Sequence, residues 1–508
     1  MLFNYKNNGQ SLLFALCLLG AAFSVISCKK LVDVGAPRTT VTTEEVFTSD
    51  ALANEVLAGI YSSMINGSLR FSNGGATVYA GLSADELANF AGTGNVSDYQ
   101  FFTNTLLAAN FSGYTLFWQP AYKDIYNANG AIAGIAASTS PALDDSTRRQ
   151  LTGEALFIRA FCYFYLTNLF GDVPLVLSTD FNQTALMKRT PQADVYKQMI
   201  QDLKDAQNLL AANYSAGLGE RIRPNKWAAT ALLARVYLYQ QDWSDAEAQA
   251  DSVIGNSQYS LVSNLNNVFL SNSQEAIWQL QQNSTIAPYT ATPEGAVLTP
   301  LLRWSTLGPA DQATFQIPSL FTYYAAYLIP SYYFSSSFMN VFEPGDKRRS
   351  IWTDSVPSPQ AAPYNGNVYY FPSKYTLHLG NAGGVSPQYY MMLRLAELYL
   401  IRAEARAQQG NNLSGAADDL NALRTRAGLG NTTAVSQTDL LTAIAHERQV
   451  ELFAEWGHRW LDLKRTGQAS AVLGAIATKQ PWSANALLYP IPAQEIVNDP
   501  NLVQNQGY

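Results

Sequence analysis

Two paired helical segments with small side chains constrain the fold of this chain more than any other feature. Apolar residues recur at helical spacing over 227–239, and after a short break a second helix begins at Ser244. The same design returns over 393–409, followed by a helix that carries Ala416 and Leu420. Because small residues let two antiparallel helices approach closely, we expect helix-turn-helix units at both places.

These units are similar in length and pattern to tetratricopeptide repeats, although the interval between them is far from the regular period of about 34 residues. Ser244 and Glu247 have the S-x-x-E spacing of a capping box. Helical stretches near 50–64, 118–135 and 194–210 can supply further partners. The sequence therefore predicts about four helix pairs, scattered along the chain rather than in tandem.

The segment 154–170 is apolar on nearly every face, which is typical of a helix that lies inside a protein. Gly171 and Pro174 are expected to end it. Its cysteine, Cys162, has aromatic residues on both sides. We interpret this side chain as packed and unreactive rather than as a reactive thiol.

Two other segments, about 71–112 and 256–387, have an irregular character. They show poor periodicity and frequent Pro, Gly, Ser and Asn, and Tyr is dense in the longer one. Compact domains rarely keep long irregular segments that have no functional role. We therefore expect the ligand site in these two segments and the scaffold in the helices.

Charge composition narrows the classes of ligand. Charged residues make up 14% of the 508 residues, against the roughly 25% usual for soluble domains, and aromatic residues make up 12%. With 32 basic and 39 acidic side chains the net charge is -7, which argues against nucleic-acid binding and against a polybasic membrane surface. Surface polarity must then come mainly from hydroxyl and amide groups, which suit neutral, hydroxylated ligands better than anions.

The N-terminal segment 1–27 has the layout of a lipoprotein signal peptide. Lys6 is the only charge before the apolar run 12–26, which is too short for a typical spanning helix. The run ends in V-I-S-C, which looks like the lipobox of bacterial lipoproteins, so Cys28 is predicted to be acylated and to become the new N-terminus. An uncleaved anchor and cleavage without lipidation remain open, and both would still export the chain.

Residues 28–43 contain Gly35 and Pro37 and few large apolar side chains, which predicts a lipidated tether. The remaining residues, 44–508, are assigned to a single domain that includes both irregular segments. Once Cys28 is acylated, one cysteine is left in the mature chain, so no intramolecular disulfide is expected.

Several segments of the chain have the form of motifs rather than of ordinary helices. The block 446–465 fits the pattern E-R-x-x-E-x-x-x-E-G-x-R-W-x-D-L-x-R, with Trp456 and His458 varying the spacing residues only. The other such segments are 159–175, 393–405, 420–428, 489–495 and 501–508. Together, although no single one would suffice, they resemble the motifs of the SusD/RagB family of outer-membrane nutrient-binding lipoproteins. In the closing motif, Gln506 stands where proline is common in the family.

The resemblance implies an all-α dominated, SusD-like fold in which about four tetratricopeptide-like pairs support a loop-rich, ligand-binding half. It also implies a lipid-anchored protein on the outer membrane, facing the cell exterior, that captures an oligosaccharide and passes it to a SusC-type TonB-dependent transporter. A helical-repeat interaction scaffold and a receptor for a non-glycan nutrient such as a peptide remain as alternatives. No cofactor is expected.

No family motif carries the ligand residues, so we choose them by chemistry. Pyranose rings stack their C–H faces on aromatic side chains, and their hydroxyls need donors and acceptors. Trp304 beside Arg303 is the preferred pair, because a planar ring next to a fork of donors suits a sugar. Each aromatic also fits a core or loop-anchoring role, and 321–334 also fits a buried aromatic helix. The candidates are Asn89, Phe90, Asn95, Tyr99, Tyr289, Arg303, Trp304, Tyr323 and Tyr324.

The charged block 447–465 is interpreted as structural rather than catalytic. Glu455 and Arg459 stand four apart, in the order that favours a helical ion pair. Trp456 and Trp460 have the same spacing and predict a parallel apolar stripe. We therefore expect this block to stabilise the fold.

No metal or catalytic site is expected. The His-Glu pair at 446–447 is not followed by a second His at H-E-x-x-H spacing, and three His with one available Cys argue against a zinc site. A glycosidase needs two carboxylates that flank one bond. The adjacent acidic pairs at 85–86 and 144–145 leave that reading open, but we interpret them as a solvated loop or a helix cap. The sequence favours a binding protein over an enzyme.

Overall fold

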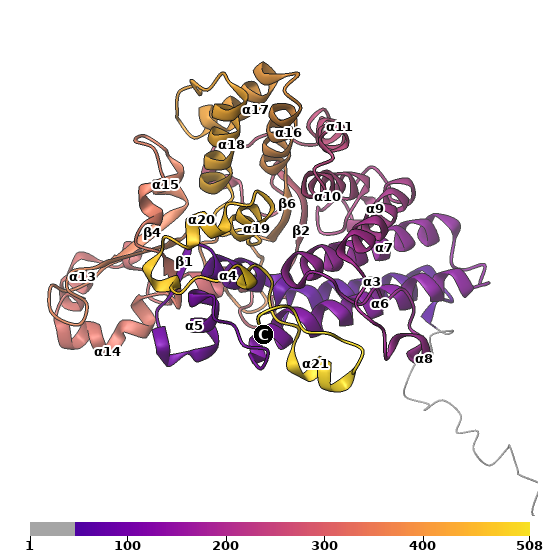
Figure 1. Cartoon of the computed structure of the whole chain (residues 1–508), viewed down its shortest axis with the longest axis horizontal. Helices are drawn as coiled ribbons and strands as arrows, with labels where there is room; N and C mark the ends of the chain where they lie inside the picture. Colours follow the sequence, from indigo (N-terminus) through magenta and orange to yellow (C-terminus); the bar gives the residue numbers. More distant parts are fainter. Residues whose placement is uncertain (1–45) are drawn as a thin grey trace, which may run out of the picture. The chain divides into compact units, whose positions relative to one another are not determined.

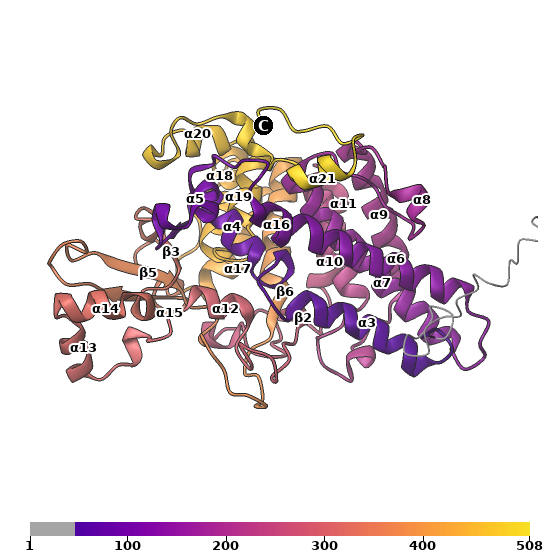
Figure 2. The same ribbon diagram turned by 90° about the horizontal axis from the view of Figure 1, so that it is seen from below.

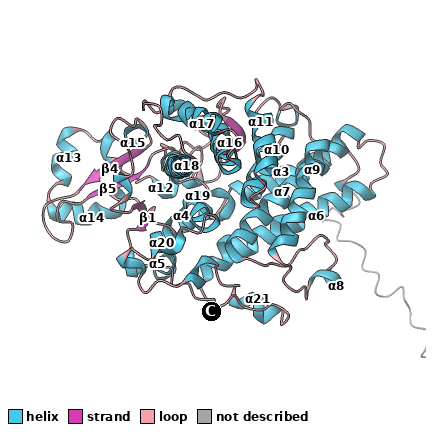
Figure 3. Ribbon diagram, turned by 45° about the horizontal axis from the view of Figure 1, so that its top comes forward, coloured by secondary structure: helices cyan, strands magenta, loops and turns pink. Residues whose placement is uncertain are grey.

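The computed structural model describes residues 46–508 of the chain. The predicted signal peptide (1–27), the predicted lipidation residue Cys28 and the tether (28–43) lie outside the described residues. Residues 47–508 form one compact unit in which helices dominate and strands are short (Figure 3). The all-α dominated fold is thus confirmed. Within 46–508, none of the helices has the length and apolar character needed to cross a membrane.

The elements have the following bounds. The longer helices are α3 (Asp50–Ile65), α4 (Gly75–Ser83), α5 (Val96–Thr103), α6 (Gln119–Ala137), α7 (Asp145–Phe170), α9 (Gln192–Leu209), α10 (Lys226–Tyr239), α11 (Trp243–Ile254), α14 (Pro318–Leu328), α16 (Leu395–Gln409), α17 (Leu413–Arg426), α18 (Gln437–Glu451) and α19 (His458–Arg465). The shorter helices are α8 (Phe181–Thr184), α12 (Pro293–Leu298), α13 (Pro309–Phe315), α15 (Arg348–Ile351), α20 (Ala469–Leu473) and α21 (Ala493–Asn498). The strands are β1 (Leu87–Asn89), β2 (Ala276–Leu280), β3 (Tyr332–Phe334), β4 (Thr353–Pro357), β5 (Val368–Pro372) and β6 (Tyr390–Arg394).

The helices pack as a continuous series of neighbours. α6 packs on α7, α7 on α9, α9 on α10 and α10 on α11 (Figure 1). α11 then packs on α16, although 256–387 separate them in the chain, and α16 packs on α17 and α18. The two predicted helix-turn-helix units are the α10/α11 and α16/α17 pairs. Repeats that are scattered in the sequence are therefore adjacent in space, because the longer irregular segment is an insertion between α11 and α16.

α7 is the most deeply buried helix of this series. The side chain of Asp144 caps its start and accepts a hydrogen bond from the backbone N–H of Thr147 at 2.8 Å, as the helix-cap interpretation predicted. Every residue from 153 to 167 is buried, which confirms the internal helix and places Cys162 among packed side chains. The helix ends at Gly171, whose φ of 78° is one that residues with side chains rarely adopt.

Three two-stranded antiparallel sheets connect the irregular segments to each other and to the helices. β1 pairs with β3, so Leu87 lies opposite Phe334 and Asn89 opposite Tyr332. β4 pairs with β5 as a hairpin, and β2 pairs with β6, which leads directly into α16. The β1–β3 pair therefore brings together the two irregular segments in which the ligand site was expected.

The predicted start of the second helical unit is wrong by two residues. α16 begins at Leu395, whereas Leu393 and Arg394 belong to β6. These two residues lie opposite Trp278 and Ala276 of β2. Pairing with a strand far away in the chain overrides the local helical pattern.

The expected capping box of α11 is also wrong. The N-cap is Asp242, whose side chain accepts a hydrogen bond from the backbone N–H of Asp245. Glu247 instead forms an ion pair with Arg406 of α16 at 2.8 Å. The Glu247 carboxylate, which the capping box would need, therefore serves the contact between α11 and α16 instead.

The segment 321–334 is not one buried helix. α14 ends at Leu328, and Tyr332 begins strand β3. Phe321 and Leu328 are fully buried, but Tyr323 on the same helix is 75% exposed. α14 therefore buries one face and leaves an aromatic face in solvent.

Candidate functional site

The longer irregular segment contains a small hydrophobic core of its own, and we call residues 299–372, together with Phe90 that packs on them, the aromatic lobe. α13 and α14 of this lobe lie at the left edge of Figures 1 and 2, whereas α6 and α9 lie at the right. The lobe therefore lies apart from the helical series. Its buried core consists of Phe321, Ala325, Leu328, Ile329, Val356, Tyr364 and Phe371.

Strand alternation decides which tyrosines of the lobe reach solvent. In β3, Tyr332 and Phe334 are buried, while Tyr333 between them is half-buried. In β5, Tyr369 is also half-buried, and its ring meets that of Tyr333 edge to face at 5.1 Å between centroids. Successive side chains of a strand point to opposite faces, so these two rings form an aromatic wall on the solvent side.

This wall lines a cleft of ≈ 540 Å³, which we call the aromatic cleft. Phe102 of α5 and Lys479 of the C-terminal segment also line it. Asp85 and Asn367 contribute polar groups, as do the serines at 335–337. Phe334, which is buried, is the fourth aromatic residue of the lining. The cleft thus combines four aromatic residues with several hydroxyl and amide groups.

The charged groups of the aromatic cleft are already engaged by the protein. Asp85 accepts two hydrogen bonds of 2.7 Å from the guanidinium of Arg459. The ammonium of Lys479 donates to the backbone carbonyls of Leu82 and Phe102 at 2.9 and 2.8 Å, and burial lowers its pKa to about 7. The groups left for a ligand are therefore mainly rings, hydroxyls and amides.

Two of the predicted residues lie directly behind the walls of the cleft. The ring of Phe90 meets that of Tyr369 at 6.2 Å, and the ring of Tyr99 meets that of Phe102 at 6.2 Å. The structure therefore brings Phe90 and Tyr99 to one site from the first irregular segment.

The predicted amides have local structural partners. Asn89 is buried and donates to the carbonyl of Gly92 at 3.0 Å. Asn95 caps α5, accepting from the backbone N–H of Asp98 at 3.2 Å and donating to its carboxylate at 2.8 Å. Both side chains hold the loop between β1 and α5 in place.

The preferred pair, Arg303 and Trp304, holds the lobe together. Arg303 forms an ion pair of 2.6 Å with Asp354 of β4 and donates to the hydroxyl of Ser373. Trp304 is half-buried against the lobe core. The structure places this pair between α13 and the β4–β5 hairpin, and neither residue lines the aromatic cleft.

The remaining candidates occupy two other places. Tyr323 is exposed on α14, whereas Tyr324 is half-buried against the lobe core. Their ring centroids lie 4.9 Å apart, and Phe315 lies 5.4 Å from Tyr324. Tyr289 has a φ of 63° in a separate loop and neither lines the cleft nor packs on the lobe core. The lobe therefore offers two aromatic surfaces, the cleft and the exposed face of α14.

Sequence reasoning missed Phe102, Tyr333, Tyr369 and Lys479. For Tyr333, the signal was the run Tyr-Tyr-Phe at 332–334, which as a strand must turn its middle ring away from the other two. No comparable signal exists for Lys479, because nothing in its sequence neighbourhood indicates that it meets Phe102.

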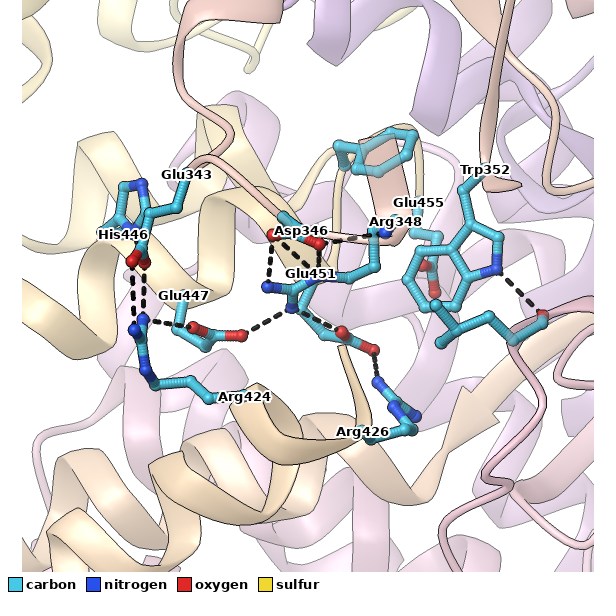
Figure 4. Close-up of polar contacts among 12 residues, drawn as sticks. Glu343, Asp346, Arg348, Trp352, Arg424, Arg426, His446, Glu447, Glu451 and Glu455 are labelled. Carbon is cyan, nitrogen blue, oxygen red and sulfur yellow. Dashed lines mark hydrogen bonds and ion pairs between the residues drawn. The ribbon is translucent and has the colours of Figure 1, made fainter. Parts of the chain in front are cut away.

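A buried network of charged side chains, which we call the ionic anchor, connects the lobe to the helical series. Its centre is Glu451 at the end of α18, whose carboxylate is bound by Arg348 at 2.8 Å and by Arg426 (Figure 4). Arg394 binds the same carboxylate at 2.6 Å. The anchor consists of Glu275, Asp346, Arg348, Lys374, Arg394, Arg426, Glu447, Glu451 and Glu455.

Lys374 connects the β4–β5 hairpin to this anchor. It follows β5 closely and donates to the carbonyls of Glu451 and Phe453 at 2.9 and 2.8 Å, and to the carboxylate of Glu455. Burial lowers the pKa of Lys374 to about 8, although the carboxylate of Glu455 opposes that shift. The base of the lobe is therefore held by groups that have lost their contact with water.

The structural interpretation of the block 447–465 agrees with the contacts, but the predicted helical ion pair is wrong. Glu455 binds Lys374 and Arg394, and Arg459 binds Asp85. The reason is that α18 ends at Glu451 and the chain turns before α19, with positive φ at Ala454, Trp456 and Gly457. The predicted spacing of a continuous helix therefore does not exist there.

The adjacent acids at 85–86 do not flank a common space. Asp85 binds Arg459, whereas Glu86 is buried and accepts a hydrogen bond from the backbone N–H of Ala454 at 3.1 Å. Burial raises the pKa of Glu86 to about 7. Across residues 46–508, no cluster of three or more His, Cys, Asp or Glu side chains is placed to hold a metal ion.

Comparisons with known proteins agree with this architecture. Residues 36–238 match a family model described as "Starch-binding associating with outer membrane", and residues 332–508 match the model of the SusD family. A SusD-like protein of Formosa agariphila, P2, is 26% identical over 510 residues, covering 92% of this chain and 94% of the relative. The starch-binding protein SusD of Bacteroides thetaiotaomicron is 35% identical over 130 residues, 23% of this chain and 21% of the relative.

Solved structures show the same fold. A laminarin-binding SusD-like protein superimposes with a TM-score of 0.71 and 25% identity, covering 91% of this chain and 100% of that protein. A SusD-like protein from Bacteroides fragilis superimposes with a TM-score of 0.73 at 21% identity, covering 93% and 100%.

Proposed function

The chain belongs to the SusD/RagB family, and from that premise we propose that it is a cell-surface lipoprotein that binds a glycan in the aromatic cleft. It then passes the glycan to a SusC-type TonB-dependent transporter in the outer membrane. The observation that carries the glycan assignment is the cleft itself, in which Phe102, Tyr333 and Tyr369 lie beside serine and asparagine side chains. Aromatic rings stack on the C–H faces of sugars, and the polar groups bind their hydroxyls.

Two further observations support a neutral saccharide. Asp85 and Lys479 in the cleft are engaged by protein partners, so neither is free to bind an ion of opposite charge. A structural neighbour of this chain is named for laminarin binding, and laminarin is the first saccharide to test. The proposal concerns a binding protein and not an enzyme.

Affinity electrophoresis in gels that contain laminarin or soluble starch tests the assignment. We expect the wild type to be retarded by at least one of them and the double variant Tyr333→Ala/Tyr369→Ala to migrate freely. The matched control is Phe181→Ala, which removes an aromatic side chain that is 77% exposed and lines none of the clefts described. Unchanged retardation of the double variant would show that the aromatic cleft is not the glycan site.

The same gels distinguish the cleft from the exposed face of α14. We expect Tyr323→Ala/Tyr324→Ala to reduce retardation less than the cleft variant, because neither tyrosine lines the aromatic cleft. The opposite order would move the binding site to α14.

The lipid anchor and the transporter partner are tested in cells. Labelled palmitate should appear on the wild type and be absent from Cys28→Ala, and persistent labelling would reject the lipidation site. The transporter should co-purify with both the wild type and the cleft variant. If both retain the transporter while the wild type binds no saccharide and instead binds peptides, the receptor is one for a non-glycan nutrient.

A further inference from the structure

A second cleft, of ≈ 440 Å³, lies where the segment 68–70, which follows α3, meets the segment that leads into α6, and we call it the basic cleft. Phe111 lines it and is 73% exposed. Arg70, Gln119 and Lys123 also line it. This cleft shares no lining residue with the aromatic cleft.

A proline explains the shape of this cleft. Pro120 has no backbone N–H, and in a regular helix its ring would clash with the carbonyl of Leu116. Residues Gly113–Trp118 instead form a wider π-helix, in which the backbone N–H of Gln119 reaches the carbonyl of Tyr114. Leu116 and Pro120 both line the cleft. Wide turns of this kind occur frequently at functional sites.

The basic groups of this cleft differ from most of the buried arginines in having no acidic partner. Arg70 donates to the hydroxyl of Ser63 at 3.1 Å, but its Nε is buried without a hydrogen-bond partner. Among residues 46–508, neither Arg70 nor Lys123 takes part in an ion pair. Lys123 is exposed. The cleft therefore offers several N–H donors and positive charge that no ion pair within residues 46–508 neutralises.

The acid behind this cleft is only partly ionised near neutral pH. Asp124, which follows Lys123 in α6, is buried, and neither of its carboxylate oxygens has a hydrogen-bond partner. Burial raises the pKa of Asp124 to about 7, although Arg70 and Lys123 oppose that shift. Glu495, which comes from another element, is a second acid that acts on this turn through Tyr114. The basic side chains are thus the dominant charges at the cleft mouth.

We propose that the basic cleft is a second binding site, for an acidic saccharide whose ring stacks on Phe111 and whose carboxylate or sulfate is bound by Arg70 and Lys123. Guanidinium and ammonium groups form charge-assisted hydrogen bonds with such anions, and an exposed aromatic ring supplies the apolar face. The inference rests on the proposed function, because it assigns a second ligand class to the same receptor. It also extends the range of ligands from the neutral saccharides that the composition favours to charged saccharides.

Calorimetric titration of the mature protein with trigalacturonate and with laminaritriose tests this inference. We expect trigalacturonate to bind the wild type. Its affinity for Arg70→Gln/Lys123→Gln should be lower by a factor on the order of ten or more, because the charged hydrogen bonds to the carboxylate are lost. Laminaritriose binding should not change in that variant. The affinity for trigalacturonate should also fall as the salt concentration rises from about 0.05 to about 0.5 M, because salt screens the attraction between the exposed basic side chains and the carboxylates of the ligand.

Matched variants separate ring recognition from charge. Phe111→Ala should weaken trigalacturonate several-fold, whereas Phe181→Ala, which removes an equally exposed ring, should leave it unchanged. Lys188→Gln removes an exposed lysine that lines none of the clefts and is the control for charge.

Four results would overturn the inference. The wild type could fail to bind trigalacturonate, or inorganic sulfate could compete as strongly per mole as the saccharide, which would indicate an anion site without ring recognition. If the protein bound anionic phospholipid vesicles through Arg70 and Lys123 and did not bind the saccharide, the cleft would be a site for a membrane surface. Loss of laminaritriose binding in the double variant would show that the two clefts are not independent. Retention of the wild type in laminarin gels tests the proposed function separately, so the two failures are distinguishable.

Discussion

The ionic anchor and the aromatic lobe differ in the kind of side chain that each one buries. In the anchor, Arg348, Glu447 and Glu451 have no exposed side-chain surface, in a chain of which only 14% is charged. In the lobe, aromatic side chains that fill the core elsewhere stay half-buried or exposed, as Tyr333 and Tyr323 do. The composition of a chain therefore does not indicate which types of side chain it buries and which it exposes.

This difference has a physical reason. A buried charge is tolerated only when partners of opposite charge and hydrogen bonds surround it, so the anchor specifies one arrangement of β5, β6, α17 and α18. Exposed rings have no such requirement and remain available for a ligand. We therefore expect variants of the anchor to change stability first, and variants of the lobe to change binding first.

The largest effect is expected for Glu451→Ala in the anchor. Removing this carboxylate leaves Arg348, Arg394 and Arg426 short of a shared partner, so we expect the free energy of unfolding to fall by about 3–5 kcal/mol. Chemical denaturation measures it. Asp194→Ala, which breaks an exposed pair with Lys197, is the control and should cost about 1 kcal/mol or less. Equal losses in the two variants would contradict the structural role of the anchor.

The next effect depends on pH and comes from the titration of Glu294 beside the anchor. Burial raises its pKa from 4.5 to about 8, so the folded state keeps a proton that the unfolded chain releases above 4.5. This contribution to stability is complete below pH 4.5 and is lost as the pH rises to 8, with a slope of at most about 1.4 kcal/mol per pH unit. Denaturation midpoints at pH 5, 6.5 and 8 should show a flatter profile for Glu294→Gln. An unchanged slope would assign the proton to another group.

Within the lobe, Trp304→Ala should loosen the packing and leave the anchor intact. Trp304 is half-buried on the lobe core, so we expect a local loss of about 2 kcal/mol. Hydrogen exchange should accelerate over 299–372 and remain unchanged over 153–167. Acceleration in both regions would mean that the lobe and the helical series unfold as one unit.

The smallest effect is expected for Arg303→Lys. The ion pair with Asp354 is partly exposed, so replacing the guanidinium by an ammonium should cost roughly 1 kcal/mol or less. Glycan retardation should stay within the error of the gel. Free migration of this variant would show that Arg303 contacts the ligand, as the sequence analysis first expected.

How far the sequence could predict this molecule depends on the range of each interaction. The buried helix at 154–170 and the pairs α10/α11 and α16/α17 are confirmed, because periodicity and small-residue faces are local properties. The helix start at 393 and the helical pair of Glu455 with Arg459 are wrong, because a strand partner and a chain turn far from the motif decide them. Phe90 and Tyr99 lie beside the aromatic cleft, but their neighbours Tyr369 and Phe102 line it because of the alternation of strand β5 and the packing of helix α5.

The sequence by itself determined the helical scaffold, the family and the two irregular segments in which a site had to be sought. Local spacing and short motifs carry that information, and each can be recognised without knowledge of the rest of the chain. Only the tertiary structure decided that Tyr333, Tyr369 and Phe102 share a cleft and that Arg70 and Lys123 form no ion pair with another residue of 46–508. The physical reason is that a cleft and an unpaired charge are defined by what surrounds them, and those neighbours come from distant parts of the chain.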